Sequence, residues 1–328
     1  MNPLVTVAIA TYNSSKFIIE TLESVKAQTY DNIELIISDD CSTDDTVEVC
    51  RKWLEGNHHR FNRVELITSN KNTGVSANCN RSNFSAKGEW IKGLGGDDKL
   101  FPNSIENYVN YIKKHPQVRV VFGIRREFGN HVEKEIEKNN KARLKALSFW
   151  KLPTAEEQFW DLIVRSPAVH SCTSFIHRDT FLKVGGYDES IPMCEDIPFW
   201  IKLTKFGYRL DMMPIETVHY RIHSESIVHT KTKKGRNLRF RKILFEVYSK
   251  YRYPILRTID SIYAQAMFYY YKREASENFK KLYYSFVFGT IKVLLFRFKK
   301  PHIRRAKYIE RIDSPQLLSI HIDQGFVR

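Results

Sequence analysis

The chain has 328 residues, enough for one large domain and an appendage. Its 42% hydrophobic and 27% charged residues are typical of a globular protein. The five cysteines include no CxxC pair, which indicates reduced, intracellular thiols rather than a disulfide framework. The first residues, MNPLVTVAIATYN, lack the features of a secretory signal, and no run of about 20 apolar residues predicts a transmembrane helix.

The net charge of +15 is concentrated at one end of the chain. Residues 226–328 hold 23 basic and 7 acidic residues, whereas the first 225 hold 29 basic and 30 acidic residues. We therefore predict a domain over residues 1–225 and a basic, aromatic, helical region over 226–328. Such an asymmetry indicates an anionic partner, such as a membrane surface, a nucleic acid or a polyanionic substrate.

The first 124 residues alternate between predicted strands and helices. Helical spacing of apolar residues predicts helices near residues 18–25, 46–54, 74–86 and 102–112. Between them, continuous apolar runs predict buried strands at Val5–Ala10, Ile33–Ser38, Val64–Thr68, Trp90–Leu94 and Arg119–Phe122. This rhythm predicts an α/β fold with a doubly wound, Rossmann-like, mostly parallel sheet and flanking helices.

The second part of the chain has a weaker pattern. Residues 125–160 are rich in charge and give no clear prediction. Further elements are then predicted as a strand at His170–His177, helices near 179–184 and 197–206, and strands at Arg209–Met213 and Thr217–His223. Beyond residue 230 the sequence predicts mainly helix.

Two adjacent carboxylates, Asp97 and Asp98, follow the strand and glycines of WIKGLGGDD. The carboxyl end of a central strand is where open α/β sheets bind ligands. Paired acids beside glycines suit a hard divalent cation whose other ligands are phosphate oxygens.

Four segments then fit one pattern: VTVAIATYNSSKFIIETLESVKAQTY (5–30), IELIISDDCSTDDT (33–46), NKNTGVSANCNRSNFSAKGEWIKGLGGDD (70–98) and VGGYDESIPMCEDIPFWIKL (184–203). In this order they resemble the inverting glycosyltransferases of family 2, of the bacterial surface-polysaccharide type, which have a GT-A fold. The resemblance covers roughly residues 4–225 and fades in the basic region.

The resemblance implies which residues bind the nucleotide-sugar. Thr11 and Asp39 correspond to residues that hold the uridine, the acid by accepting from the ring N–H of the base. The implied donor-binding residues are Thr11, Tyr12, Asn13, Asp39, Asn70, Gly74, Asn78, Arg81, Gly96 and Asp97, with Asp40 as a further candidate. Turn formation and capping are an alternative role for Asp39 and Asp40, and Arg81 could equally be a solvated arginine on a helix face.

The metal motif is incomplete. The acid–any–acid triplet of the family aligns with Gly95-Gly96-Asp97, so its first carboxylate is missing. The resemblance implies that Asp97 coordinates Mn²⁺ or Mg²⁺, which bridges the diphosphate, and that His223 is a second ligand. Imidazole suits Mn²⁺ better than Mg²⁺. Asp98 would cap or orient the segment that follows.

The catalytic base is assigned from the pair Glu195 and Asp196, which precedes a predicted amphipathic helix. An inverting transfer needs a carboxylate that takes the proton of the acceptor hydroxyl. Asp196 matches the base of the family, although it also stands where a helix N-cap is expected. Glu195 would orient the acceptor or a nearby loop.

The basic region contains FKKLYYSFVFGTIKVLLFRFKK (279–300), which is typical of a helix in a membrane interface with cations at anionic headgroups. A helix packed on the catalytic domain is the alternative. Aromatic and basic residues also occur in nucleic-acid-binding proteins, but no nucleic-acid motif is present.

The sequence therefore predicts metal-dependent transfer from a UDP-sugar to a hydroxyl of a lipid-linked glycan, at the cytoplasmic face of the membrane. The degraded metal motif leaves a catalytically weak GT-A scaffold as an alternative. A nucleotidyltransferase would carry a glycine- and basic-rich loop after the first strand, and TYNSSKF is a poor match.

Overall fold

The computed structural model describes residues 2–129, 146–164 and 169–223, and in addition residues 231–232, 235–236, 247 and 250. The chain divides into two compact units, Met1–Tyr253 and Pro254–Arg328, and every described residue belongs to the first. The segment 279–300, predicted to meet a membrane, lies outside the described residues. A catalytic domain that ends at residue 225 stays a prediction.

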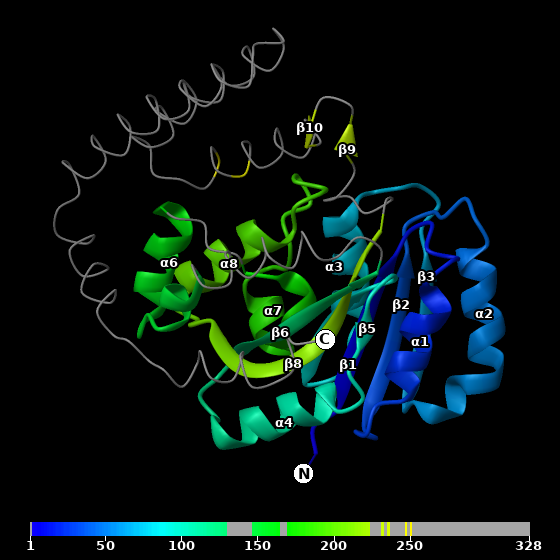
Figure 1. Ribbon diagram of the computed structural model, residues 1–328, viewed down its shortest axis with the longest axis horizontal. Coiled ribbons are helices and arrows are strands. Elements are labelled where there is room, and N and C mark those ends of the chain that lie inside the picture. The colour runs from blue at the N-terminus through cyan, green and yellow to red at the C-terminus, as the bar shows by residue number, and fades with distance from the viewer. Residues whose placement is uncertain are drawn as a thin grey trace, which may run out of the picture. The chain divides into compact units, whose positions relative to one another are not determined.

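An eight-stranded sheet forms the centre of the first unit (Figure 1). Its strands are, in chain order, β1 (Val5–Thr11), β2 (Ile33–Asp39), β3 (Arg63–Thr68), β4 (Trp90–Gly95), β5 (Lys99–Leu100), β6 (Val120–Gly129), β7 (Ser174–His177) and β8 (Asp211–Ile222). Their order in the sheet is β3-β2-β1-β4-β7-β6-β8-β5, with antiparallel pairing only at β7 and β5. The predicted α/β class with a mostly parallel sheet is confirmed. A separate short antiparallel pair joins β9 (Lys231–Thr232) and β10 (Gly235–Arg236).

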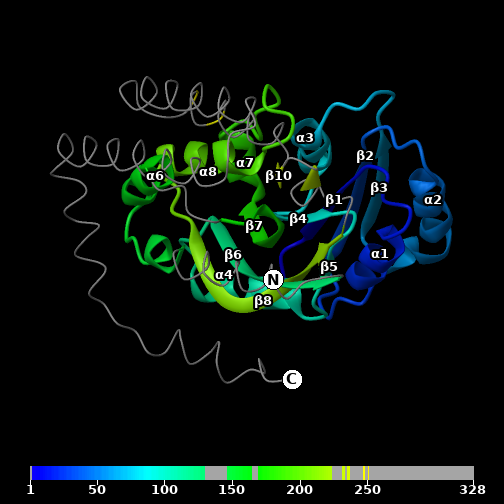
Figure 2. The ribbon, with the colours of Figure 1, turned by 45° about the horizontal axis from the view of Figure 1, so that its top comes forward.

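Helices cover both faces of the sheet (Figures 1 and 2). Helices α1 and α2 lie side by side on one face, α3 packs against β1 and β2 on the other, and α6 packs against α8. The helices are α1 (Ile18–Lys26), α2 (Thr46–Asn57), α3 (Val75–Ser85), α4 (Ser104–Lys114), α6 (Ala155–Val164), α7 (Arg178–Lys183) and α8 (Asp196–Lys205), with 3₁₀ turns at His58–Arg60 and Ser171–Thr173.

Burial on both faces explains the continuous apolar runs of the first strands. In β1, Val5, Val7 and Ile9 join the core built with α1, α2 and α4, whereas Thr6 and Ala8 are buried on the opposite face. A strand covered on both sides cannot alternate between apolar and polar residues.

Four predicted strands differ from the observed ones. The two strands expected at 209–213 and 217–223 form one strand, β8, which curves across the sheet (Figure 2). Its pairing with β6 is irregular around Pro214, because proline cannot donate to the ladder. Strand β6 extends to Gly129, into the charge-rich segment, and the strand expected at 170–177 begins only at Ser174 after a 3₁₀ turn.

The register brings the carboxyl ends of four strands to one edge. Thr11 pairs with Asp39, Asp39 pairs with Thr68, and Ala10 pairs with Gly95. The loops that leave these strand ends carry most of the predicted donor-binding residues.

Candidate active site

Thr11 and Gly96 meet where β1 and β4 end. The Gly96 N–H donates to the carbonyl of Ala10 at 3.0 Å. A Cβ at position 96 would lie 2.7 Å from Thr11 Oγ1 and 2.9 Å from Thr11 Cβ, so only glycine fits without movement. The Thr11 hydroxyl is buried and has no hydrogen-bond partner among the described residues.

The loops after β1 and β2 are joined to each other. Asn13, at φ +50°, accepts the Thr43 N–H at 2.8 Å through its side chain, and its own N–H donates to Ser42 Oγ at 2.8 Å. The buried Asp39 carboxylate accepts the Ser42 N–H at 2.8 Å and the Ser42 hydroxyl. Asp39 thus shapes the turn from within, as the turn-forming alternative expects, and its contact with a base stays a prediction.

Asp40 is buried against the loop that precedes α3. Its carboxylate accepts the N–H groups of Thr73 and Gly74 at 2.9 and 2.7 Å, the Thr73 hydroxyl at 2.7 Å and the Arg81 guanidinium at 2.6 Å. Burial alone would raise the pKa of Asp40, but these donors hold it below its ordinary value. Arg81 also donates to Thr73 Oγ1 and Asn78 Oδ1, so it is not a solvated helix-face arginine.

The remaining predicted donor residues differ in exposure. Asn78 is buried, accepts the Ser38 hydroxyl at 2.7 Å and donates to the carbonyl of Thr11 at 3.1 Å, so it ties α3 to both central strands. Tyr12 and Asn70 are exposed in the loops that follow β1 and β3. Their side chains are accessible to a ligand at this edge.

Asp97 and His223 lie together although 126 positions separate them. His223 Nε2 is 3.0 Å from Asp97 Oδ2, and the aspartate side chain is 35% exposed. Among the described residues no group of three or more His, Cys, Asp or Glu side chains could hold a metal ion. One imidazole nitrogen and one carboxylate oxygen nevertheless fit a Mn²⁺ whose other ligands are phosphate oxygens.

Asp98 has a different environment from its neighbour. It is buried, and its Oδ1 accepts the N–H of Arg221 at 2.9 Å. Burial, followed by the negative charge of Asp97, raises its pKa well above the ordinary value, while the Arg221 N–H and nearby cations oppose the shift. Asp98 therefore anchors β8 to the end of β4 and is not accessible as a surface ligand.

Glu195 and Asp196 stand at the start of α8. Asp196 Oδ1 accepts the Ile197 N–H at 2.7 Å, and Glu195 accepts the Ser171 hydroxyl at 3.1 Å. Burial raises the pKa of Asp196, and burial together with the charge of Asp196 raises the pKa of Glu195 to about 7. The N-cap residue of α8 is Glu195, which makes no side-chain cap hydrogen bond, and Asp196 is the first residue of the helix, so the N-cap position expected for Asp196 is wrong by one residue. The role of Asp196 as the base stays a prediction.

Hydrogen bonds from Ser76 and Asn80 of α3 join the loops that carry the predicted donor-binding residues to the segment before α8. Ser76 donates to the carbonyl of Ile191 at 2.6 Å. Asn80 donates to the carbonyl of Tyr187 at 3.1 Å and accepts its N–H at 2.9 Å. The left-handed Gly186 lies against Asn80, since a Cβ there would be 2.7 Å from Asn80 Oδ1.

The pKa of the Cys79 thiol, also on α3, responds to charges from the predicted donor residues and from the pair at the start of α8. Burial raises its pKa, the charge of Glu195 adds to this effect, and Arg81 and Asp40 act on it in opposite directions. Through α3, the loops with the predicted donor residues thus join the segment that leads to the predicted base.

Two cations beside the site, one fully buried and one with a side chain that is 12% exposed, were not singled out from the sequence. Lys92 of β4 is fully buried and donates to the carbonyls of Gly93 and Cys172, and burial lowers its pKa to about 8. Arg221 of β8 donates to the carbonyl of Asp97. Lysine and arginine side chains are usually exposed, so the sequence gave no reason to expect Lys92 or Arg221 inside the protein beside the site.

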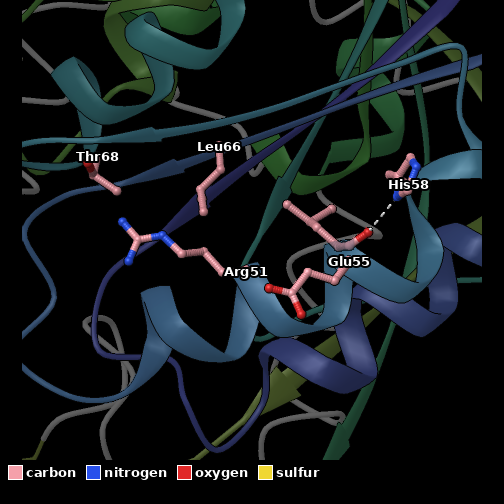
Figure 3. Close-up of a pocket in the computed structure, with 6 residues that line it drawn as sticks. Arg51, Glu55, His58, Leu66 and Thr68 are labelled. Atoms are coloured by element: carbon pink, nitrogen blue, oxygen red, sulfur yellow. Dashed lines mark hydrogen bonds between the residues drawn. The ribbon is translucent and has the colours of Figure 1, made fainter.

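An open hollow of about 480 Å³ lies elsewhere, over α2 and β3 (Figure 3). Its lining includes Arg51, Glu55, Leu66 and Thr68, together with His58, whose Nδ1 contacts the carbonyl of Leu54 at 3.1 Å. No predicted site residue lines this hollow.

The fold and the site together define a glycosyltransferase of the GT-A fold. The sequence model of Glycosyl transferase family 2 matches residues 6–182, more than half of the chain, and the chain therefore belongs to this family.

Curated relatives share part of the chain. An uncharacterized glycosyltransferase of Haemophilus influenzae is 26% identical over 225 residues, which are 67% of this chain and 66% of that protein. GlyG of Streptococcus pneumoniae is 32% identical over 35% of this chain and 36% of its own length. The chondroitin synthase of Escherichia coli is 27% identical over 74% of this chain, but the match spans only 30% of that protein. The chain thus spans less than two thirds of these relatives.

Solved structures share the fold. TarS residues 1–349 of S. aureus, in complex with UDP-GlcNAc, has a TM-score of 0.55 at 18% identity over 74% of this chain and 65% of TarS 1–349. The mannosyltransferase PcManGT of Pyrobaculum calidifontis, in complex with GDP-Man and Mn²⁺, has a TM-score of 0.53 at 18% identity over 98% of this chain and 87% of its own. In the described part of the chain, no helix has the length and apolar character needed to cross a membrane.

Proposed function

We propose that this chain is a metal-dependent, inverting glycosyltransferase that moves a hexose or N-acetylhexosamine from a UDP-sugar to a hydroxyl of a lipid-linked glycan, in the synthesis of O-antigen, capsule or another surface polysaccharide. The observation that carries most weight is the Asp97–His223 pair, 3.0 Å apart at the end of β4. It lies on the sheet edge that also bears Thr11 and Asp39, where nucleotide-binding α/β sheets hold their ligands.

In this proposal Thr11, Tyr12, Asn13 and Asp39 bind the uridine. The complex of TarS with UDP-GlcNAc supports UDP as the carrier, and the complex of PcManGT with GDP-Man makes GDP the alternative. The Asp40–Arg81 contact would act indirectly, since it fixes the 73–74 loop beside the nucleotide.

Asp97 and His223 would hold the metal ion through one oxygen and one nitrogen. When bound, Mn²⁺ or Mg²⁺ would supply Lewis-acid stabilisation of the charge that builds on the leaving diphosphate. The Mn²⁺ complex of PcManGT supports a divalent ion in a protein of this fold.

Asp196 would be the general base. It takes the proton of the acceptor hydroxyl while the hydroxyl oxygen bonds to the anomeric carbon. The bond from that carbon to the diphosphate oxygen breaks, UDP leaves with the electron pair, and the configuration inverts without a covalent enzyme intermediate. Glu195, held by Ser171, would orient the acceptor.

Release of UDP from a panel of UDP-sugars, with and without Mn²⁺, tests this function. We expect one UDP-sugar to raise the melting temperature and to be turned over faster with Mn²⁺ and with acceptor lipid extract. Binding of UDP-sugar without any UDP release under these conditions would instead support the catalytically weak scaffold, for which the missing acid at Gly95 is the argument.

We also propose that residues 226–328 attach the enzyme to the anionic inner face of the cytoplasmic membrane, because their charge is strongly positive. The full chain should float with vesicles that contain phosphatidylglycerol and not with neutral vesicles. Equal binding to both kinds of vesicle would contradict an electrostatic attachment.

A further inference from the structure

Arg221 contacts both residues of the acidic pair at the end of β4. Its Nε donates to the carbonyl oxygen of Asp97 at 2.8 Å, and its own N–H donates to Asp98 Oδ1 at 2.9 Å. Its guanidinium also pairs with Glu20 of α1 at 3.0 Å, and its side chain is only 12% exposed. One residue of β8 therefore joins the end of β4 to the first helix.

Arg221 is also packed between two aromatic rings. Its guanidinium carbon lies 4.8 Å from the ring centre of Phe17 and 4.5 Å from that of Phe128. Such cation–π contacts hold a planar guanidinium in one orientation. The ring of Phe17 is in turn 4.7 Å from the ring of His223.

His223 depends on this packing. Its Nε2 faces Asp97, while its Nδ1 is buried without a hydrogen-bond partner among the described residues. Histidines that ligate metals usually donate their second nitrogen to an acceptor that fixes the ring. Here the contact with Phe17 takes the place of that second hydrogen bond.

We propose that Arg221 is a positioning residue that fixes both predicted metal ligands, Asp97 through its carbonyl group and His223 through Phe17. The inference rests on the metal site of the proposed function. It extends that site to the β1–α1 connection, because Phe17 and Glu20 follow the loop predicted to hold the uridine. Metal and nucleotide would then be held by one connected group of side chains.

Lys99 provides a matched control. It shares two partners with Arg221, since its Nζ is 3.1 Å from Glu20 Oε2 and 4.6 Å from the ring centre of Phe128. The described contacts of Lys99 do not include Asp97 or Phe17. Loss of a positive charge near Glu20 is therefore common to substitutions at both positions, whereas loss of the ligand-fixing contacts is specific to Arg221.

The test measures Mn²⁺ binding to the full-length chain by electron paramagnetic resonance, with and without UDP. The variants are Arg221→Lys, Arg221→Met, Phe17→Leu and Lys99→Met. Substitution of residues that orient metal ligands weakens metal affinity by about 10- to 100-fold. We expect the first three variants to lose at least tenfold in Mn²⁺ affinity and Lys99→Met to stay within about twofold of the wild type.

Each outcome bears on a different statement. Wild-type affinity in the Arg221 variants, or an equal loss in Lys99→Met, would overturn the positioning role while leaving the metal site intact. A wild-type chain that binds no Mn²⁺ in either condition would overturn the metal site itself and this inference with it. Phe17→Leu keeps the polar contacts of Arg221, so it covers the case in which an Arg221 variant fails to fold.

Discussion

Asp196 combines a structural contact with the proposed chemical role, and one substitution separates them. Asparagine keeps a side-chain oxygen for the Ile197 N–H but cannot take a proton. We expect Asp196→Asn to lower kcat at least about 100-fold, in the range that general bases contribute, with the affinity for UDP-sugar and the melting temperature nearly unchanged. Steady-state kinetics and thermal unfolding check both parts.

The control for this substitution is Asp196→Ala, which removes the contact with the Ile197 N–H as well. If asparagine retained wild-type turnover while alanine lost both turnover and stability, Asp196 would have only a structural role at the start of α8.

The ionised Glu195 carboxylate lowers the free energy of unfolding at neutral pH. Its pKa in the folded chain, about 7, lies above the ordinary value of 4.5. The folded state therefore keeps a proton that the unfolded state releases, and stability falls as pH rises from 4.5 through 7. Glu195→Gln should raise the free energy of unfolding by about 1–3 kcal/mol at pH 8.5 and have little effect at pH 4.5.

Denaturant titrations at the two pH values measure this difference. Glu48→Gln is a suitable control, because the Glu48 side chain is 76% exposed and should give no pH-dependent gain. An equal effect of Glu195→Gln at both pH values would contradict a raised pKa in the folded state.

At the scale of elements, the close approach of β1 and β4 depends on Gly96. A Cβ at this position would meet Thr11 Oγ1 at 2.7 Å, and Thr11 is buried and cannot rotate into solvent. Gly96→Ala should destabilise the chain by about 1–3 kcal/mol, as overpacking does, and weaken UDP binding by moving the ends of both strands. Calorimetric unfolding and UDP titration measure the two effects.

Gly93 of β4, three residues before Gly96, is the matched control, since a Cβ there would meet nothing within 4 Å. Gly93→Ala should leave both stability and UDP binding close to wild type. If the two substitutions behaved alike, strand propensity rather than the contact with Thr11 would be the cause.

The elements that the sequence marks most clearly are those buried on both faces. Strands β1, β2 and β4 are covered on two sides, so their apolar runs mark their ends to within about a residue. The edge strand β3 is partly exposed along its length, yet the run Val64–Thr68 also predicted its ends. Strand β5 has only two residues, Lys99 and Leu100, and forms because β8 pairs with it. Only the second half of β6 was hidden in charged sequence, where Arg125 and Glu127 form an ion pair at 3.0 Å that leaves their side chains 11% and 2% exposed.

The site was predictable only in part for the same reason. The positions of Thr11, Asp39 and Asp97 follow from strand ends, which the sequence marks. Contact between Asp97 and His223 requires the antiparallel pairing of β5 with β8, which no local pattern encodes. Arg221 could not be predicted, because its aromatic partners come from separate parts of the chain.

At the scale of the whole unit, a buried polar network around Glu34 and the proposed ligand site lie at opposite ends of the sheet. Glu34, at the start of β2, is fully buried and accepts the Thr6 hydroxyl, the Arg63 guanidinium and the N–H groups of Lys87 and Gly88. Burial alone would raise its pKa, but these donors lower it below 4.5. Its charge thus joins three strands far from the ligand edge.

Glu34→Gln should lower the free energy of unfolding by about 3–5 kcal/mol at pH 7, since it leaves buried donors without their charged partner. The contribution of Glu34 is present above pH 4.5 and is lost as pH falls through its folded-state pKa, so the gap between variant and wild type should narrow in acid. Urea unfolding between pH 3 and 7 measures this gap.

Glu65→Gln serves as the control, because Glu65 shares the Arg63 partner but its side chain is 35% exposed. A cost below about 1 kcal/mol is expected there. If the Glu34 and Glu65 variants lost equal stability at every pH, the buried network would not be the source of the effect.

The hydrogen bonds between α3 and the segment before α8 have a consequence for how this protein could diversify. Ser76 and Asn80 hold the segment before α8 mainly through main-chain groups of Tyr187 and Ile191, and one further bond joins Asn80 to the Glu189 carboxylate at 2.8 Å. Main-chain groups are present whatever side chains the segment carries. Mutation of the exposed residues Glu189 and Ser190 can therefore proceed without loss of these main-chain contacts, whereas Tyr187 and Ile191 are buried and constrained. A lineage could change this exposed surface by small steps, and laboratory libraries confined to positions 189 and 190 should yield mostly folded variants.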